Sequence, residues 1–369
     1  MTARSAGGKA RKIINLALQG GGSHGAFAWG VLDRLLDEPD IEFEGLSGTS
    51  AGAVNAVVLA HGIMNGGRAG GQKALENFWR SSSHGGSVWS PMHHVPQVEI
   101  PGMEAFNAAS FAVLDTLTRT FSPYELNPFD VNPLRDLLTD TVDFEGLRDH
   151  CDIKLFLSAT NVRSGRVRVF KTKEVSVDVV MASACLPFLY KAVEIEDQHY
   201  WDGGYMGNPV LFPFFYECDS RDVMIVHINP MERHDLPMTA PEILNRINEI
   251  SFNSSLIEEM RAINFVTRLI EEDWLKDDHK NKLKHILVHS VRSDAALENL
   301  PVSSKFDVRW SFLTDLRDRG RAEAETWLKA NRDAIGERST ADLESQYLGR
   351  AGAHPLDGNP EDNAINEAN

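Results

Sequence analysis

A serine flanked by glycines, in the segment Gly48-Thr49-Ser50-Ala51-Gly52, follows one apolar run and precedes another rich in small residues. This G-x-S-x-G pattern carries chemistry where a strand turns sharply into a helix, because the glycines leave room for the turn and the serine projects from the sheet edge. The amino end of the following helix has a partial positive charge that stabilises an adjacent oxyanion. The pattern therefore predicts a nucleophilic Ser50.

The segment Gly20-Gly21-Gly22-Ser23-His24-Gly25 is a second chemical candidate. Its G-x-G-x-x-G spacing fits a dinucleotide-binding loop, and Glu42 and Glu44 follow about twenty residues later. Backbone amides at a glycine-rich helix start can instead bind an oxyanion. We favour this second interpretation, because the next strand leads into the Ser50 turn where a ribose-binding acid would lie. The predicted oxyanion-hole amides belong to Gly20, Gly21, Gly22 and Ser23, with His24 and Gly25 completing the motif.

The turn Asp202-Gly203-Gly204 is a third candidate, directly after Tyr200-Trp201. Asp-Gly is a common turn pair, so a catalytic interpretation depends on the presence of Ser50. A serine nucleophile needs a base, which is usually histidine. His227 falls in an apolar run, and the loop histidines lack diagnostic neighbours; these are His84, His93, His94, His199 and His234. A conventional Ser-His-Asp esterase remains an alternative that would require an essential histidine.

Two successive strand, glycine-turn and helix units are predicted to position these residues. The first comprises a strand at 13–18 and a helix at 24–38, and the second a strand at 41–47 and a helix at 51–62. Such units predict an α/β fold with a mainly parallel central sheet sandwiched by helices. Further strands are predicted near 153–162, 166–172, 193–202, 223–229 and 284–291.

The pattern changes along the chain and predicts its organisation. We expect a flexible N-terminus at 1–12, a catalytic domain at 13–230, and a mostly helical C-terminal extension at 231–349 that includes helices at 241–272 and within 306–332. Glycines and prolines interrupt the periodicity over 65–133, which we interpret as a lid or insertion with one helix near 103–119. The acidic tail at 350–369 has few apolar residues and is predicted to be disordered.

Composition excludes several classes of function. The chain has 37 Lys and Arg against 53 Asp and Glu, and the resulting net charge of -16 opposes binding to nucleic acid. Its three cysteines show no spacing typical of a disulfide framework or a zinc site, and we expect no metal and no cofactor. No apolar run is long enough to span a membrane or to form a signal peptide. These features predict a cytoplasmic protein of undefined oligomeric state.

In order and spacing, the three motifs resemble those of the patatin-like phospholipases: an oxyanion-hole glycine loop, a G-x-S-x-G turn and a D-G-[AG] turn. The resemblance covers residues 13 to about 213, including the segment SACLPFLYKAV. It implies that Ser50 is the nucleophile and Asp202 the proton acceptor of a Ser-Asp dyad, without metal or cofactor. It also implies a lipid or other acyl-ester substrate. Peripheral contact with a membrane or lipid granule is a further hypothesis.

Several points stay open at this stage. A carboxylate of ordinary pKa is a weak base, so the dyad would depend on direct contact and partial desolvation. Many relatives have Arg or Lys where this chain has His24, and our hypothesis is that His24 relaxes a preference for anionic head groups and adds pH sensitivity near 6.5. A noncatalytic lipid-binding or regulatory protein is a further alternative. Head group, acyl-chain length and positional preference are undefined.

Overall fold

Parallel strands form the middle of the sheet, because apolar runs buried on both faces suit strands covered by helices on each side. The computed structural model describes residues 11–84, 120–233, 235–276, 279, 282–297, 300 and 302–349. The parallel strands pair in the order β3-β2-β1-β7-β8. Their bounds are β1 (Lys12–Leu18), β2 (Ile41–Gly48), β3 (Lys154–Asn161), β7 (Asp222–Val226) and β8 (Leu287–Val291). The prediction of a mainly parallel sheet is confirmed.

Antiparallel strands complete one edge of the sheet. Both β4 (Val167–Lys171) and β6 (Gln198–Asp202) pair with β3, and β5 (Val193–Ile195) pairs with β6. The turn between β5 and β6 has two residues at positive φ, Glu196 and Asp197, as expected for a two-residue hairpin. This hairpin delivers the end of β6 to the middle of β3.

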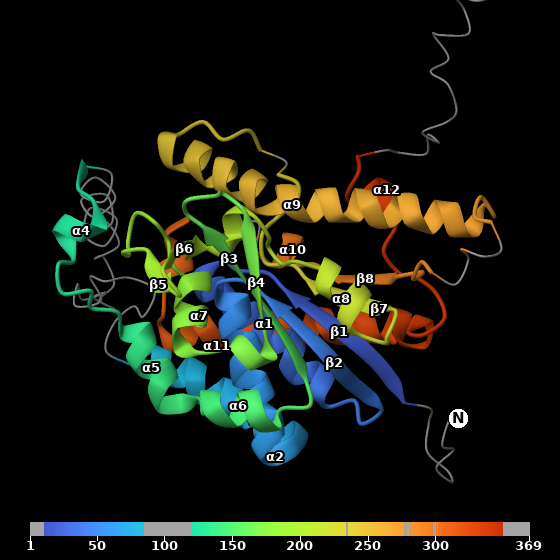
Figure 1. Ribbon diagram of the computed structural model, residues 1–369, viewed down its shortest axis with the longest axis horizontal. Helices are drawn as coiled ribbons and strands as arrows, with labels where there is room; N and C mark the ends of the chain where they lie inside the picture. Colours follow the sequence, from blue (N-terminus) through green and yellow to red (C-terminus); the bar gives the residue numbers. More distant parts are fainter. Residues whose placement is uncertain are drawn as a thin grey trace, which may run out of the picture.

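Helices cover both faces of the sheet (Figure 1). Leu16 and Leu18 of β1 enter one hydrophobic core, while Ala17, between them, enters the other. The first core is covered by α1 (Gly25–Leu36), α2 (Ala51–Ser82), α5 (Pro133–Thr141), α6 (Phe144–His150), α7 (Val177–Ser183) and α11 (Trp310–Asn331). The second is covered by α8 (Phe212–Glu217), α9 (Ala240–Glu271) and α12 (Leu343–Gln346).

Short helices occupy the connections. These are α4 (Pro123–Leu126), α10 (Asp294–Leu297), η1 (Gly22–His24), η2 (Thr172–Glu174), η3 (Gly203–Tyr205), η5 (Val302–Phe306) and η6 (Arg332–Ala334). No helix among the described residues is both long enough and apolar enough to cross a membrane.

The structure corrects the interpretation of residues 65–82 as the start of an irregular insertion. They belong to α2, and the glycine-rich stretch produces only a kink at Gly66 and Gly67, where Gly67 has a φ of 59°. Gly62 precedes the kink and Ala74 follows it, and an ideal Cβ on Gly62 would be 2.6 Å from the Cβ of Ala74. The part of α2 after the kink therefore folds back against the part before it. Small residues therefore mark a close helix contact here. Of the lid or insertion predicted at 65–133, residues 85–119 lie outside the described residues, as do the helix predicted near 103–119 and the terminal segments 1–10 and 350–369. Its last part, 120–133, contains the short helix α4.

The C-terminal region is part of the same architecture. Strand β8 extends the central sheet beside β7, and α11 packs on α1. The region 306–332, where two helices were expected, contains one long helix after the short η5. The predicted helix at 241–272 is confirmed as α9, which lies along the upper side of the molecule in Figure 1.

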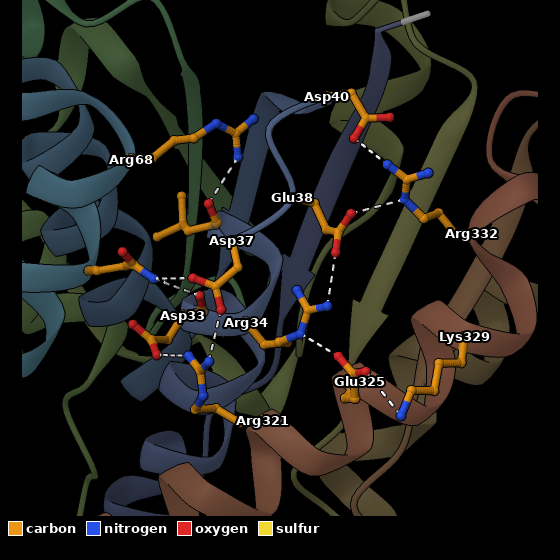
Figure 2. Close-up of polar contacts among 12 residues, drawn as sticks. Asp33, Arg34, Asp37, Glu38, Asp40, Arg68, Arg321, Glu325, Lys329 and Arg332 are labelled. Atoms are coloured by element: carbon orange, nitrogen blue, oxygen red, sulfur yellow. Dashed lines mark hydrogen bonds and ion pairs between the residues drawn. The ribbon is translucent and has the colours of Figure 1, made fainter. Parts of the chain in front are cut away.

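The backbones of α1 and α11 approach each other through two glycines. An ideal Cβ on Gly30 would be 1.9 Å from the carbonyl oxygen of Arg317, and one on Gly320 would be 2.0 Å from that of Phe27. Figure 2 shows the ion pairs that border this contact, in which Arg34 contacts Glu38 and Glu325, Arg321 contacts Asp33 and Asp37, and Arg332 contacts Glu38 and Asp40. Only residues without side-chain bulk fit at the crossing.

Candidate active site

The predicted turn at Ser50 is present between β2 and α2. Ser50 has φ 55° and ψ -123°, a backbone conformation that is costly for a residue other than glycine. The flanking glycines are required by close contacts: an ideal Cβ on Gly52 would be 2.1 Å from the carbonyl oxygen of Leu18, and one on Gly48 would be 2.5 Å from that of Gly52. The turn thus holds Ser50 in a strained conformation at the amino end of α2.

The Ser50 turn is buried and further fixed by hydrogen bonds. Ser50 is 9% exposed, and its amide donates to the hydroxyl oxygen of Ser183 at 3.0 Å. The neighbouring Thr49 hydroxyl donates to the carbonyl of Gly207 at 2.7 Å and lies 2.6 Å from the Ser158 hydroxyl. These contacts connect the serine turn to the segment that follows Asp202.

Asp202 is positioned by the end of β6. It pairs with Ala159 of β3, and its amide donates to the carbonyl of Cys185 at 2.7 Å. Its carboxylate accepts the amide of Gly204 through Oδ1 at 2.7 Å. Gly203 has no room for a side chain, since an ideal Cβ would be 2.3 Å from the carbonyl oxygen of Ser158. The Asp-Gly-Gly turn therefore fixes the aspartate against the centre of the sheet.

The environment of Asp202 makes it a stronger base than an exposed aspartate. It is 1% exposed, and its burial raises the pKa of the carboxyl from 3.8 to about 7, although hydrogen bonds from the Gly204 amide and the Ser50 side chain lower it. Its Oδ2 atom has no hydrogen-bond partner among the described residues. Ser50 and Asp202 are thus brought together, and desolvation of the aspartate is greater than the partial effect expected from the sequence.

The glycine loop lies directly against the Ser50 turn, because β1 and β2 are parallel neighbours with Leu18 paired to Gly48. An ideal Cβ on Gly20 would be 2.5 Å from the Cβ of Ser50, and one on Gly25 would be 2.8 Å from that of Ala51. Gly22 has a φ of 60° and faces the carbonyl oxygen of Lys305. The loop and the serine turn therefore form one compact unit.

Backbone amides of this loop differ in their availability. The Gly20 amide donates to Oδ1 of Asn208 at 2.6 Å and is therefore engaged. Gly22 and Ser23 begin the helical segment η1, whose first N–H groups have no partner within the helix. We accordingly assign the oxyanion-binding proposal to Gly21, Gly22 and Ser23 and leave out Gly20.

His24 does not have the properties expected from the sequence. Its side chain is 5% exposed, and its Nε2 lies 2.7 Å from the Ser304 hydroxyl, 280 residues away along the chain. The pKa of His24 is lowered to about 3, mainly by burial and in smaller part by the charges of Lys305 and Arg233. The imidazole is therefore neutral over the ordinary pH range, and the expected pH sensitivity near 6.5 is wrong.

Other histidines have partners of their own. His227 is buried, hydrogen-bonds to the Tyr347 hydroxyl at 2.8 Å and has its pKa lowered to about 3 by burial. His289 contacts Asp222 at 2.9 Å, at the start of β7 and thus at the opposite end of the sheet from Ser50. His93, His94 and His234 lie outside the described residues. The structure supplies no histidine contact to Ser50 within the part of the chain it describes.

Sequence reasoning missed a group of buried amide side chains behind the glycine loop. Gln19 lies at the end of β1, Asn208 follows the Asp-Gly-Gly turn, Asn229 follows β7, and Asn253 belongs to α9. All four are nearly or fully buried. Gln19 and Asn208 could have been noticed from their positions next to motifs, whereas Asn229 and Asn253 belong to no sequence pattern.

A family of known proteins matches much of this chain. A family model described as "Patatin-like phospholipase" matches residues 16–215, more than half of the chain. No curated protein matches. Among solved structures, VipD from Legionella pneumophila is similar with 14% sequence identity and a TM-score of 0.42, over 94% of this chain and 75% of that chain. On the strength of the family match, the chain belongs to the patatin-like phospholipase family.

Proposed function

We propose that this protein is a serine acyl hydrolase that cleaves carboxylic esters of lipids through a Ser50–Asp202 dyad. The observation that carries the proposal is the buried Asp202 carboxylate beside Ser50, with its pKa raised to about 7 and its Oδ2 available to a hydroxyl. A general base is most effective when its pKa lies near the working pH. Membership of a family of lipid acyl hydrolases supports the same reaction class.

The reaction follows from the positions of these groups. The Ser50 hydroxyl attacks the ester carbonyl carbon while Asp202 takes its proton through Oδ2, and the carbonyl oxygen becomes an oxyanion. Amides of Gly21, Gly22 and Ser23, together with the amino end of α2, stabilise that charge. Asp202 returns the proton to the departing alcohol. Water, deprotonated by the same carboxyl, then releases the acid from the acyl-serine and restores the hydroxyl.

A noncatalytic lipid-binding protein is a weaker interpretation. Binding an acyl chain requires apolar surface, whereas this site combines a strained serine with a buried carboxylate. Both features cost stability, by about 1–3 kcal/mol for the backbone strain alone, and such strain persists chiefly where function requires it. An acyl hydrolase accounts for both features together.

The proposal is tested by combining turnover with a covalent probe. We expect the protein to hydrolyse p-nitrophenyl esters, and a fluorophosphonate to attach to Ser50, with release of fluoride and transfer of the hydroxyl proton to Asp202. Mass mapping of the labelled peptide identifies the residue, and a series of acyl-chain lengths defines the acyl pocket. A folded protein that neither hydrolyses any ester nor becomes labelled at Ser50 would contradict the proposal.

Exposed isoleucines on α9 support contact of this site with a lipid surface. Ile243, Ile247 and Ile250 follow a helical spacing and are 43%, 55% and 55% exposed. Just beyond them, Phe252 contacts Gly204 and packs against Tyr205 with ring centroids 5.5 Å apart. The isoleucine stripe thus belongs to the helix segment that borders the Asp202 turn. With a net charge of -16, insertion of apolar side chains is favoured over electrostatic attraction to anionic lipids.

Substituting Ile247 with aspartate tests this contact. We expect hydrolysis of phospholipid in zwitterionic vesicles to fall by about 10–150-fold, because one inserted isoleucine contributes roughly 1.5–3 kcal/mol. Hydrolysis of a soluble short-chain ester should not change. Phe265→Asp is a matched control, since Phe265 is 61% exposed and lies about 27 Å further along α9. Equal losses on both substrates, or from both variants, would rule out a specific surface contact.

A further inference from the structure

Two asparagines hold the peptide groups of Gly20 from opposite directions. The Gly20 amide donates to Oδ1 of Asn208 at 2.6 Å, and the Gly20 carbonyl accepts from Nδ2 of Asn229 at 2.7 Å. Both asparagine side chains are fully buried. Asn208 and Asn229 are called the asparagine clamp below. The clamp acts on the residue of the glycine loop that lies closest to Ser50.

Gln19 joins the two halves of the clamp. Its Oε1 accepts the amides of Ile228 and Asn229 at 2.9 and 3.0 Å. Its Nε2 donates to the carbonyl of Asn208 at 3.3 Å and to Oδ1 of Asn253 at 3.0 Å. In a buried environment, a network of linked hydrogen bonds holds the groups that it joins in fixed positions. The ends of β1 and β7, the segment after Asp202, and α9 are therefore tied together behind the loop.

Gly20 needs restraint from outside, because glycine has the widest choice of backbone conformations. The Gly20 carbonyl and the Gly21 amide lie in one peptide plane, so fixing that carbonyl sets the direction in which the Gly21 amide points and the start of the path to the Gly22 amide. Those amides stabilise an oxyanion only if they are placed correctly relative to Ser50, and a displacement of about 1 Å can cost about 100-fold in rate. Restraint of Gly20 therefore restricts the positions of the amides that would bind the oxyanion.

We propose that Asn208 and Asn229 are positioning residues that set the oxyanion-binding loop through Gly20. This inference rests on the proposed hydrolase function. Asn229 lies beyond residues 16–215 that match the family model, so part of the machinery comes from the C-terminal region. Within the described residues, Nδ2 of Asn208 and Oδ1 of Asn229 have no partner, although an unsatisfied buried polar atom costs about 1–3 kcal/mol. The clamp therefore serves geometry at the expense of stability.

The clamp is tested by substitutions that keep or remove the hydrogen-bond acceptor of Asn208 or the hydrogen-bond donor of Asn229. On a soluble short-chain ester, Asn208→Ala and Asn229→Ala should each lower kcat by about 100-fold, with KM changed by less than about threefold. At alkaline pH, Asn208→Asp still accepts the Gly20 amide and should recover at least about tenfold of that loss. Asn229→Asp cannot donate when ionised and repels the Gly20 carbonyl, so it should show no recovery. The opposite responses to aspartate identify which atom acts at each position.

Controls separate this inference from folding and from the proposed function. Asn264 lies on α9, the same helix as Asn253, and its part-buried side-chain amide hydrogen-bonds to Glu344. Asn264→Ala removes this amide and should leave kcat unchanged. The urea midpoint of each variant, measured by circular dichroism, shows that it is folded. If the unsubstituted protein turns over ester but the clamp variants match it, or lose activity only through KM, this inference is wrong while the proposed function stands. If the unsubstituted protein is inert and unlabelled, both are wrong.

Discussion

Asp202→Asn is expected to lower kcat on a soluble ester by about 10³–10⁴-fold, because the amide preserves the shape of the side chain but cannot take the proton of Ser50. Ser50→Ala should abolish turnover and fluorophosphonate labelling, since the attacking oxygen is removed. The two losses should not add in the double variant, because both residues act in the same step. Initial rates with p-nitrophenyl esters measure all three variants.

The pH profile gives an independent reading of the same carboxyl group. Asp202 must be ionised to act as a base, and its pKa is raised to about 7, so kcat/KM should rise as the pH increases through about 7. His24 should add no inflection, because its pKa is lowered to about 3. A profile with its inflection near 4, the ordinary range of an exposed aspartate, would contradict the proposed role of burial.

Stability provides the control for Asp202→Asn. The pKa of Asp202 is higher in the folded than in the unfolded chain, so its contribution to stability is fully present below pH 3.8 and is lost as the pH rises through about 7. Above that pH, the neutral asparagine avoids the cost of a buried charge. The variant should therefore unfold at a higher urea concentration than the unsubstituted protein at pH 8. Lower stability of the variant at that pH would show that its inactivity reflects damaged structure.

Gly320→Ala is expected to destabilise the fold by about 3 kcal/mol, the upper range for overpacking. The new Cβ would lie 2.0 Å from the carbonyl oxygen of Phe27, so α11 must move away from α1. Alanine favours an isolated helix by about 1 kcal/mol over glycine, and this gain is too small to offset the clash. Urea unfolding monitored by tryptophan fluorescence measures the change.

Two comparisons locate the effect at the helix crossing. Gly66→Ala should change stability by less than about 0.5 kcal/mol, because an ideal Cβ there meets no atom within 4 Å. Arg321→Ala removes partly exposed ion pairs to Asp33 and Asp37 and should cost no more than about 1 kcal/mol. If Arg321→Ala were as damaging as Gly320→Ala, the ion pairs rather than the backbone contact would hold the helices together.

The sequence was informative where a local pattern and its physical cause coincide. Glycines around Ser50 are needed for a turn that lies within five residues, and the apolar run before it is the strand that must precede it. The parallel sheet and the long helix α9 followed in the same way from periodicity. Such features depend on neighbours in the sequence, so one chain is sufficient to predict them.

Other features depend on residues that meet only in the folded chain. The hydrogen bond of His24 depends on Ser304, and the charge of Lys305 contributes to its lowered pKa. The restraint of Gly20 depends on Asn229, and none of these three residues belongs to a motif. The glycines near residue 65 were interpreted as breaks because glycine has two uses, in turns and in close helix packing. Periodicity could not distinguish between these uses without the partner helix.

The contact between α1 and α11 has a consequence for biosynthesis. Ser50 and Asp202 leave the ribosome long before α11, yet α1, the helix that begins at the glycine loop, gains its contact with α11 only when residues 310–331 have emerged. Contacts between such distant segments form late and slowly during folding. A nascent chain therefore contains all three sequence motifs while α1, which follows the glycine loop, lacks its packing against α11. Under the proposed function, ester hydrolysis should therefore begin only after residues 310–331 have emerged and packed on α1.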